Sequence, residues 1–284
     1  MNTSQKVIVN SIRENLAGRR SFLGNMGMAS AGLGAFLATV ETADAQVTDV
    51  DILQFALNLE YLEAEFYTMA RTGKTIDQMG IGITGSGTPG ATTGGKMVTF
   101  IEGSTLARSA DEIAIDERTH VTLLRGALTA AGVSPVAKPA INLNALGIGF
   151  GSQEEFITLG RAFEDVGVSA YGGAAPLISS KAYLATAARI LAAEAEHVGS
   201  LRLHAALYNV KVPPVDPADI VPPPSPNGRF SSLDSNALSI VRTPGQVLYI
   251  VYGSQPGAKS GGFFPNGTNG TLNMADATPA KPSV

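Results

Sequence analysis

Two stretches of the sequence decide the fold: Glu117-Arg118-Thr119-His120 and Glu194-Ala195-Glu196-His197. Each places a glutamate three residues before a histidine, and the chain has only three histidines in all. On an α-helix, residues i and i+3 lie on one face about 5 to 6 Å apart. Each stretch can therefore present a carboxylate and an imidazole to one metal centre.

Four long helices are predicted around these stretches, because apolar residues recur at helical spacing. They span residues 49–71, 97–131, 153–171 and 179–208. A Gly-rich loop, residues 72–96, separates the first two, and the connection 132–152 is long enough to return the chain to the same end of a bundle. The Gly172-Gly173 and Pro176 corner is short, so the last two helices should be antiparallel neighbours. The predicted fold class is all-α, a four-helix bundle with a long crossover between the second and third helices.

The first and third helices carry a second repeated pattern. Glu60 is followed seven residues later by Tyr67, and Glu164 by Tyr171. The four helices then read Glu, Glu-x-x-His, Glu, Glu-x-x-His, the ligand order of di-iron and di-manganese carboxylate bundles. The predicted ligands of two divalent ions, Fe or Mn, are Glu60, Glu117, His120, Glu164, Glu194 and His197.

Other polar residues on these helices are interpreted differently. Glu63 lies three residues after Glu60 and could replace it as a ligand or add a further carboxylate. Tyr67 and Tyr171 are predicted to be core residues or hydrogen-bond donors beside the ligands. His204 has no glutamate three residues earlier and is expected at the edge of the bundle. A single glutamate on a helix usually faces solvent, which is the expectation for Glu65, Glu112 and Glu196, and for Glu63 where it is not a ligand.

The composition of the chain limits which metal ligands and which binding partners are expected. The chain has no cysteine, so metal ligands must be carboxylate, imidazole or backbone groups. It has 20 Lys and Arg against 24 Asp and Glu and no basic run, so nucleic acid is not expected as a partner. Four carboxylates in an apolar interior are tolerable only with about four compensating positive charges, which two divalent ions supply.

The N-terminal residues, 1–45, have the features of a twin-arginine signal peptide. Arg19-Arg20 precede a weakly apolar stretch, residues 22–40, and Ala43-Asp44-Ala45 is a small-x-small cleavage site. The alternative is an amphipathic N-terminus or a membrane anchor, although the apolar run falls short of the ~20 residues that span a bilayer. The sequence predicts recognition by the twin-arginine export machinery and a periplasmic or extracellular location.

The remaining organisation follows from composition. We expect the signal peptide, a bundle domain and a Pro/Gly-rich extension that packs on the bundle, over residues 1–45, 46–210 and 211–284. Thr243-Pro244 predicts the start of a short helix in the extension, residues 246–252, which Gly253 ends. Two aromatic residues farther on, Phe263-Phe264, are expected to pack onto the bundle.

The segment from Asn58 to Tyr67, together with the two Glu-x-x-His stretches and the segment from Glu164 to Tyr171, resembles the ferritin-like superfamily. Within it, the chain is similar to exported bacterial ferritin-like domain proteins related to plant desiccation-related proteins. Segments 242–253 and 261–267 share in the resemblance, which covers roughly residues 48–270. The resemblance implies a ferritin-like bundle with a dinuclear Fe or Mn site. The Gly-rich loop 72–96 departs from compact ferritins.

Together, the ligand pattern and the resemblance imply an exported di-metal protein that acts on peroxide or dioxygen, by ferroxidase-like or catalase-like chemistry, in stress protection. The alternative is a non-catalytic envelope protein, structural or interacting, that protects during desiccation and uses metal only for stability. Iron storage in a cage ranks third, because a tail of about 75 residues would have to be placed on the shell. Metal identity, substrate and homo-oligomerisation stay open at this point.

Overall fold

Four long helices form a bundle in the computed structural model, which describes residues 47–281. A fifth, shorter helix lies in the C-terminal extension, and this confirms the predicted all-α class. Within the described residues the α-helices are α3 (Asp49–Thr72), α4 (Thr105–Ala130), α5 (Gln153–Ala174), α6 (Lys181–Leu207) and α7 (Pro244–Val251). None of these described helices is long and apolar enough to cross a membrane.

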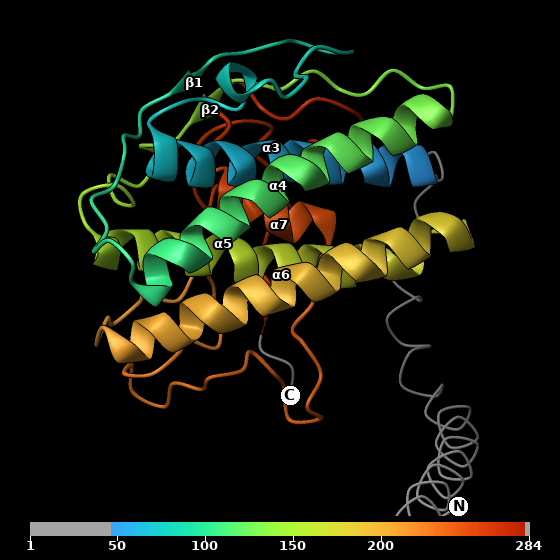
Figure 1. The fold of residues 1–284 in the computed structure, drawn as a ribbon. Coiled ribbons are helices and arrows are strands. Elements are labelled where there is room, and N and C mark those ends of the chain that lie inside the picture. The colour runs from blue at the N-terminus through green and yellow to red at the C-terminus, as the bar shows by residue number, and fades with distance from the viewer. Residues whose placement is uncertain (1–46, 282–284) are drawn as a thin grey trace, which may run out of the picture. The chain divides into compact units, whose positions relative to one another are not determined.

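The bundle is built from two helix pairs. α3 packs along α4 and α5 along α6, with fewer contacts between the pairs. Figure 1 shows α3 and α4 running in opposite directions, whereas α4 and α5 run in the same direction. The connection between α4 and α5 therefore returns along the bundle, as the predicted crossover requires. The corner between α5 and α6 is a single short 3₁₀ helix, η2 (Ala175–Leu177), so these two helices are antiparallel neighbours.

Side-chain caps set where the helices begin. Thr48 caps α3 in a capping box with Asp51, and Thr243 caps α7 in the same way with Gln246. Ser104 caps α4, which begins eight residues later than the predicted start at residue 97. Gly103, directly before this cap, has a φ of 73°, a left-handed conformation that does not continue a helix. The apolar residues before it lie in an irregular segment that ends in a turn, so their spacing did not predict a helix correctly.

The Gly-rich segment between α3 and α4 is not structureless. It contains a 3₁₀ helix, η1 (Asp77–Met79), and a short strand, β1 (Thr92–Thr93). β1 pairs in parallel with β2 (Ile141–Asn142) of the crossover connection. The two long connections thus bind each other on the outside of α3.

This covering layer corrects the expectation for Glu65. The Glu65 side chain is fully buried rather than solvent-facing, and the Nζ atom of Lys138 lies 3.2 Å from its Oε1 atom. Lys138 belongs to the crossover connection and also donates to Thr92 Oγ1 at 2.7 Å. The crossover connection thus packs on α3 and pairs Lys138 with Glu65. This ion pair does not involve any of the predicted ligands.

The C-terminal extension packs against the bundle. α7 buries Val247 and Leu248, and it contacts α5. Phe263 and Phe264 are both buried, and the Phe263 ring meets the Phe163 ring of α5 edge to face with centroids 5.0 Å apart. Phe263 therefore packs onto the bundle as expected, whereas the Phe264 ring meets the Tyr252 ring of the extension.

Candidate metal centre

Each helix of the bundle brings part of one buried polar cluster to the interior. α3 and α5 each contribute a glutamate, and α4 and α6 each contribute a glutamate with the histidine one turn later. No residue in the set is more than 8% exposed. The structure brings together all six predicted residues: Glu60, Glu117, His120, Glu164, Glu194 and His197.

The two histidines point their Nδ1 atoms at the carboxylates. His120 Nδ1 lies 3.3 Å from Glu60 Oε2, 3.4 Å from Glu117 Oε2 and 3.5 Å from Glu194 Oε1. His197 Nδ1 lies 3.1 Å from Glu117 Oε1 and 3.2 Å from Glu164 Oε2. The imidazole rings stack with centroids 6.2 Å apart. The two rings thus contact different members of one carboxylate cluster, and both contact Glu117.

The ligand atoms form two overlapping groups. Within each group, all atoms lie within 4.8 Å of one another. Glu117 and Glu194 belong to both groups, whereas Glu60 with His120, and Glu164 with His197, belong to one group each. Two carboxylates shared between two ligand groups are the arrangement that bridging ligands need.

The hydrogen bonding of the cluster fits a bound cation. Buried polar groups normally have hydrogen-bond partners, and exceptions need an explanation. Within the described residues, most buried side-chain nitrogen and oxygen atoms without such a partner belong to this set, including both carboxylate oxygens of Glu117 and of Glu194 and the Nδ1 atom of His120. Carboxylate oxygens and imidazole nitrogens gathered at one place, several of them without a hydrogen-bond partner, are ligands that Fe and Mn accept.

A family model for the ferritin-like domain matches residues 48–207, which span the whole bundle and every residue of this cluster. The chain belongs to the ferritin-like family. It is also similar to a curated protein named ferritin-like catalase Nec2, from Nesocodon mauritianus. The two are 25% identical, and the alignment covers 82% of this chain and 88% of the relative.

Burial and mutual repulsion govern the protonation of the ferritin-like cluster without metal. Burial, and then the charges of Glu194 and Glu60, raise the pKa of Glu117 to about 8. Burial and the charge of Glu164 raise the pKa of Glu194 well above its ordinary value. Burial alone would lower the pKa of His197, but Glu117 and Glu164 outweigh it and raise that pKa to about 12. Metal ions must therefore displace protons when they bind.

Two side chains outside the set of six, Tyr171 and Asp116, contact ligand residues. Tyr171 donates its hydroxyl proton to Glu60 Oε1 at 2.5 Å, whereas Tyr67 donates to the backbone carbonyl of Gly160 at 3.2 Å. The predicted donor role beside a ligand is thus observed directly for Tyr171. His197 Nε2 lies 3.2 Å from Oδ2 of Asp116, a half-exposed residue that the sequence analysis missed. A carboxylate on the second nitrogen fixes the orientation and tautomer of a ligand histidine.

The remaining candidates lie outside both ligand groups. Glu63 is buried beside the cluster but contributes to neither group. His204 is buried, with Nε2 3.1 Å from Thr105 Oγ1 and Nδ1 2.9 Å from the Ser200 carbonyl oxygen, away from the cluster. Two glutamates expected to face solvent do so, Glu112 and Glu196.

Proposed function

We propose that this chain is an exported protein with two divalent metal ions, Fe or Mn, that consumes peroxide in stress protection. The observation that carries the proposal is the pair of ligand groups that share Glu117 and Glu194. Each group offers three carboxylates and one imidazole, and the shared carboxylates would bridge the ions. Glu60 and His120 would complete one ion's coordination, and Glu164 and His197 the other's.

The name of the relative, a ferritin-like catalase, supports peroxide as the substrate. In a catalase reaction one hydrogen peroxide releases two electrons and two protons and leaves as dioxygen. A second peroxide takes up these electrons and protons, its O–O bond breaks, and two waters form. A pair of redox-active metal ions, when bound, supplies the store for the two electrons. The chain's own residues hold the ions close together and exclude bulk water, since every ligand is buried.

The test is metal analysis followed by peroxide consumption. We expect about two Fe or Mn ions per chain and catalytic release of dioxygen from hydrogen peroxide. Glu117→Gln should lower the metal affinity and the peroxide rate by about 10–100-fold or more, because it removes a carboxylate from both ligand groups. Glu154→Gln, at an exposed position of α5 outside both ligand groups, is the control and should leave both unchanged. Wild type that binds metal but consumes no peroxide with Fe or Mn would favour the non-catalytic, desiccation-protective alternative.

Export is a separate part of the proposal, and it depends on residues 1–46, which lie outside the described part of the chain. The twin-arginine pathway reads the arginine pair as an address. Replacing Arg19 and Arg20 with lysine should therefore leave the precursor in the cytoplasm. Unchanged export would indicate a general secretory signal instead.

A further inference from the structure

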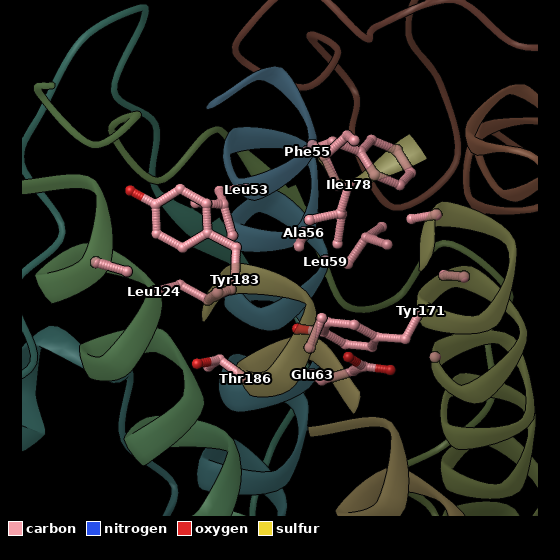
Figure 2. A pocket seen from close by; sticks show the side chains of 16 residues that line it. Leu53, Phe55, Ala56, Leu59, Glu63, Leu124, Tyr171, Ile178, Tyr183 and Thr186 are labelled. Carbon is pink, nitrogen blue, oxygen red and sulfur yellow. The ribbon is translucent and has the colours of Figure 1, made fainter. Parts of the chain in front are cut away.

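A small apolar pocket lies beside the carboxylate cluster, enclosed by α3, α4, α5 and α6 (Figure 2). Its wall is almost entirely aliphatic or aromatic, with Leu59 and Ala56 on α3, Leu124 on α4, and Ala187 on α6. Tyr183 and Thr186, at the start of α6, line it and are partly exposed. This end of α6 is therefore the outer side of the pocket.

The inner end of the pocket adjoins the predicted ligands at three points. Tyr171 lines the pocket and donates its hydroxyl proton to Glu60 at 2.5 Å. Gly167 also lines it, and a Cβ atom at this position would lie 2.5 Å from Glu194 Oε2 and 3.2 Å from Glu63 Oε1. Real Cβ atoms do not approach an oxygen so closely, so only glycine leaves the pocket open to the Glu194 carboxylate at this point.

The third inner residue, Glu63, supplies a carboxyl group. The residue is 5% exposed, and no salt bridge joins it to a lysine, arginine or histidine within the described residues 47–281. In Figure 2 the Glu63 carboxyl group and the Tyr171 ring lie next to each other at one end of the pocket, away from Phe55 and Leu53. A buried carboxyl group facing an apolar pocket is available to hydrogen-bond a molecule that enters it.

Size and polarity define that molecule. The pocket volume is about 30 Å³, and about 10–15 Å³ on the same measure holds one water. This space suits a molecule of about two non-hydrogen atoms. An apolar wall also opposes a charged molecule, because removing an ion from water costs far more than removing a neutral one.

A second opening near the centre has the opposite character. It lies between α4 and α6, has a volume of about 400 Å³, and is lined by Glu112, Asp116, Glu196 and Arg108 as well as by His197. This polar cleft is lined by a ligand histidine. The apolar pocket is lined by Tyr171, which donates to Glu60, and by Gly167, which adjoins Glu194. The two openings therefore differ in the molecules that they can admit.

We propose that the apolar pocket is the passage by which a small uncharged molecule with two oxygen atoms, hydrogen peroxide or dioxygen, reaches the Glu60 and Glu194 side of the metal centre. Glu63 and Tyr171 form its inner end, and Ala187 lies on its wall. The inference rests on the proposed di-metal function and adds the substrate's size, charge and route.

The experiment measures access separately from catalysis. Nitric oxide is small and uncharged and changes the absorption spectrum of ferrous iron when it binds, so its association rate with the iron-loaded protein reports entry. Ala187→Phe places a ring in the pocket and should slow nitric oxide association at least tenfold. Ala188→Phe, the next residue on the same helix, is exposed and outside the pocket lining, and should leave the rate within twofold. Thr186→Phe, at a partly exposed position, replaces Ala187→Phe if that variant does not fold or load iron.

The outcomes separate the passage from the catalytic proposal. Slowing by the pocket substitution but not by the control supports the passage, and a matching decrease in kcat/KM for hydrogen peroxide extends it to the substrate. Equal rates in wild type and pocket variants, or equal slowing by the control, would overturn the passage even if peroxide is consumed. Wild type that binds nitric oxide through the passage but consumes no peroxide would overturn the catalytic function and leave the passage standing.

Discussion

Two regions of the molecule bury acidic side chains and neutralise them in opposite ways. Where α5 and α6 meet the C-terminal extension, Asp165 accepts a hydrogen bond from Arg202 at 2.7 Å, and Arg161 donates to Asp219 at 2.7 Å. These arginines are almost fully buried. In the metal centre, within the part of the chain that the structure describes, no lysine or arginine forms a salt bridge with the six predicted ligands or Glu63.

The difference shows which region balances its buried charges with its own side chains and which region needs a bound cation. In the first region the chain supplies a guanidinium group for each carboxylate, so that charge and hydrogen bonds are balanced internally. In the second, five buried glutamates share two imidazoles, and oxygens of Glu117 and Glu194 lack hydrogen bonds. The region that depends on arginine should therefore respond to mutation, and the region that depends on cations should respond to metal and pH.

Breaking the internally balanced region should have the largest effect. Arg202→Met removes a guanidinium group that binds Asp165 and also the carbonyls of Ile220 and Phe230. Arg161 Nη1 stays 3.4 Å from Asp165 Oδ2, so the carboxylate keeps a weaker partner. We therefore expect the free energy of unfolding by denaturant to fall by about 2–3 kcal/mol, at or below the lower end of the about 3–5 kcal/mol that leaving a buried charge unpaired costs. The control is Arg189→Met on the exposed side of the same helix, which should change it by less than about 0.5 kcal/mol. A loss below about 1 kcal/mol for Arg202→Met would contradict the comparison.

The pH dependence of stability should separate the two forms of the metal centre. Without metal, Glu117 has a pKa of about 8 against an ordinary value of 4.5, so the folded protein binds more protons than the unfolded chain between these values. Stability then falls as pH rises from 5 to 8, by up to about 1.4 kcal/mol per pH unit for each such proton. The raised pKa of His197 acts in the same direction above its ordinary value of 6.5.

The measurement is the melting temperature at pH 5 and pH 7, with and without a chelator. We expect the metal-free protein to melt at a lower temperature at pH 7 than at pH 5, and the metal-loaded protein to change much less. A metal-free protein that becomes more stable toward pH 7, or that melts together with the loaded form at pH 7, would mean that the ligand carboxylates are not repelling one another.

A smaller effect, with opposite signs in the two forms, is expected from Glu117→Gln. The amide keeps the shape of the side chain and stays neutral above pH 8, where the metal-free glutamate, with its pKa of about 8, would ionise. Metal-free Glu117→Gln should therefore be about as stable as metal-free wild type at pH 7 and more stable above pH 8, by a gain of up to about 1–2 kcal/mol. The same variant should gain less stability from added Mn or Fe. A destabilised metal-free variant would indicate that the charge is already compensated by the chain.

The features that follow from local periodicity, namely the helices and the ligand pairs within one helix, could be predicted from the sequence. A glutamate and a histidine three residues apart on a helix share a face wherever the helix is placed, so Glu117 with His120 and Glu194 with His197 could be predicted to act together. The helix bounds followed from apolar spacing, except at the start of α4, where Gly103 and the Ser104 cap overrode it. The family match, residues 48–207, covers the same helices.

The parts that depend on distant pairing could not be predicted. Glu65 is neutralised by Lys138, 73 positions away on the crossover connection, and no local pattern links them. The same holds for Asp165 and Arg202, 37 residues apart. Asp116 gave no signal because its partner, His197, lies on another helix. Pairing of this kind is set by tertiary packing, which one sequence does not display.

The smallest effect concerns the two tyrosines that the sequence treats alike, seven residues after Glu60 and Glu164. Tyr171 donates to the Glu60 carboxylate, whereas Tyr67 donates to a backbone carbonyl. Removing a hydrogen-bonded group beside a metal ligand lowers metal affinity about 10–100-fold, so Tyr171→Phe should weaken metal binding by about tenfold. Tyr67→Phe is the comparison variant: its hydroxyl donates to the Gly160 carbonyl and also adjoins the Glu164 carboxylate. Its hydrogen bond stabilises the fold by about 1 kcal/mol, and we expect a smaller loss of metal affinity, within about threefold of wild type. The measurement is competition with a chelator at fixed pH. Equal losses of affinity in the two variants would show that both hydroxyls support ligands and that the distinction between them is wrong.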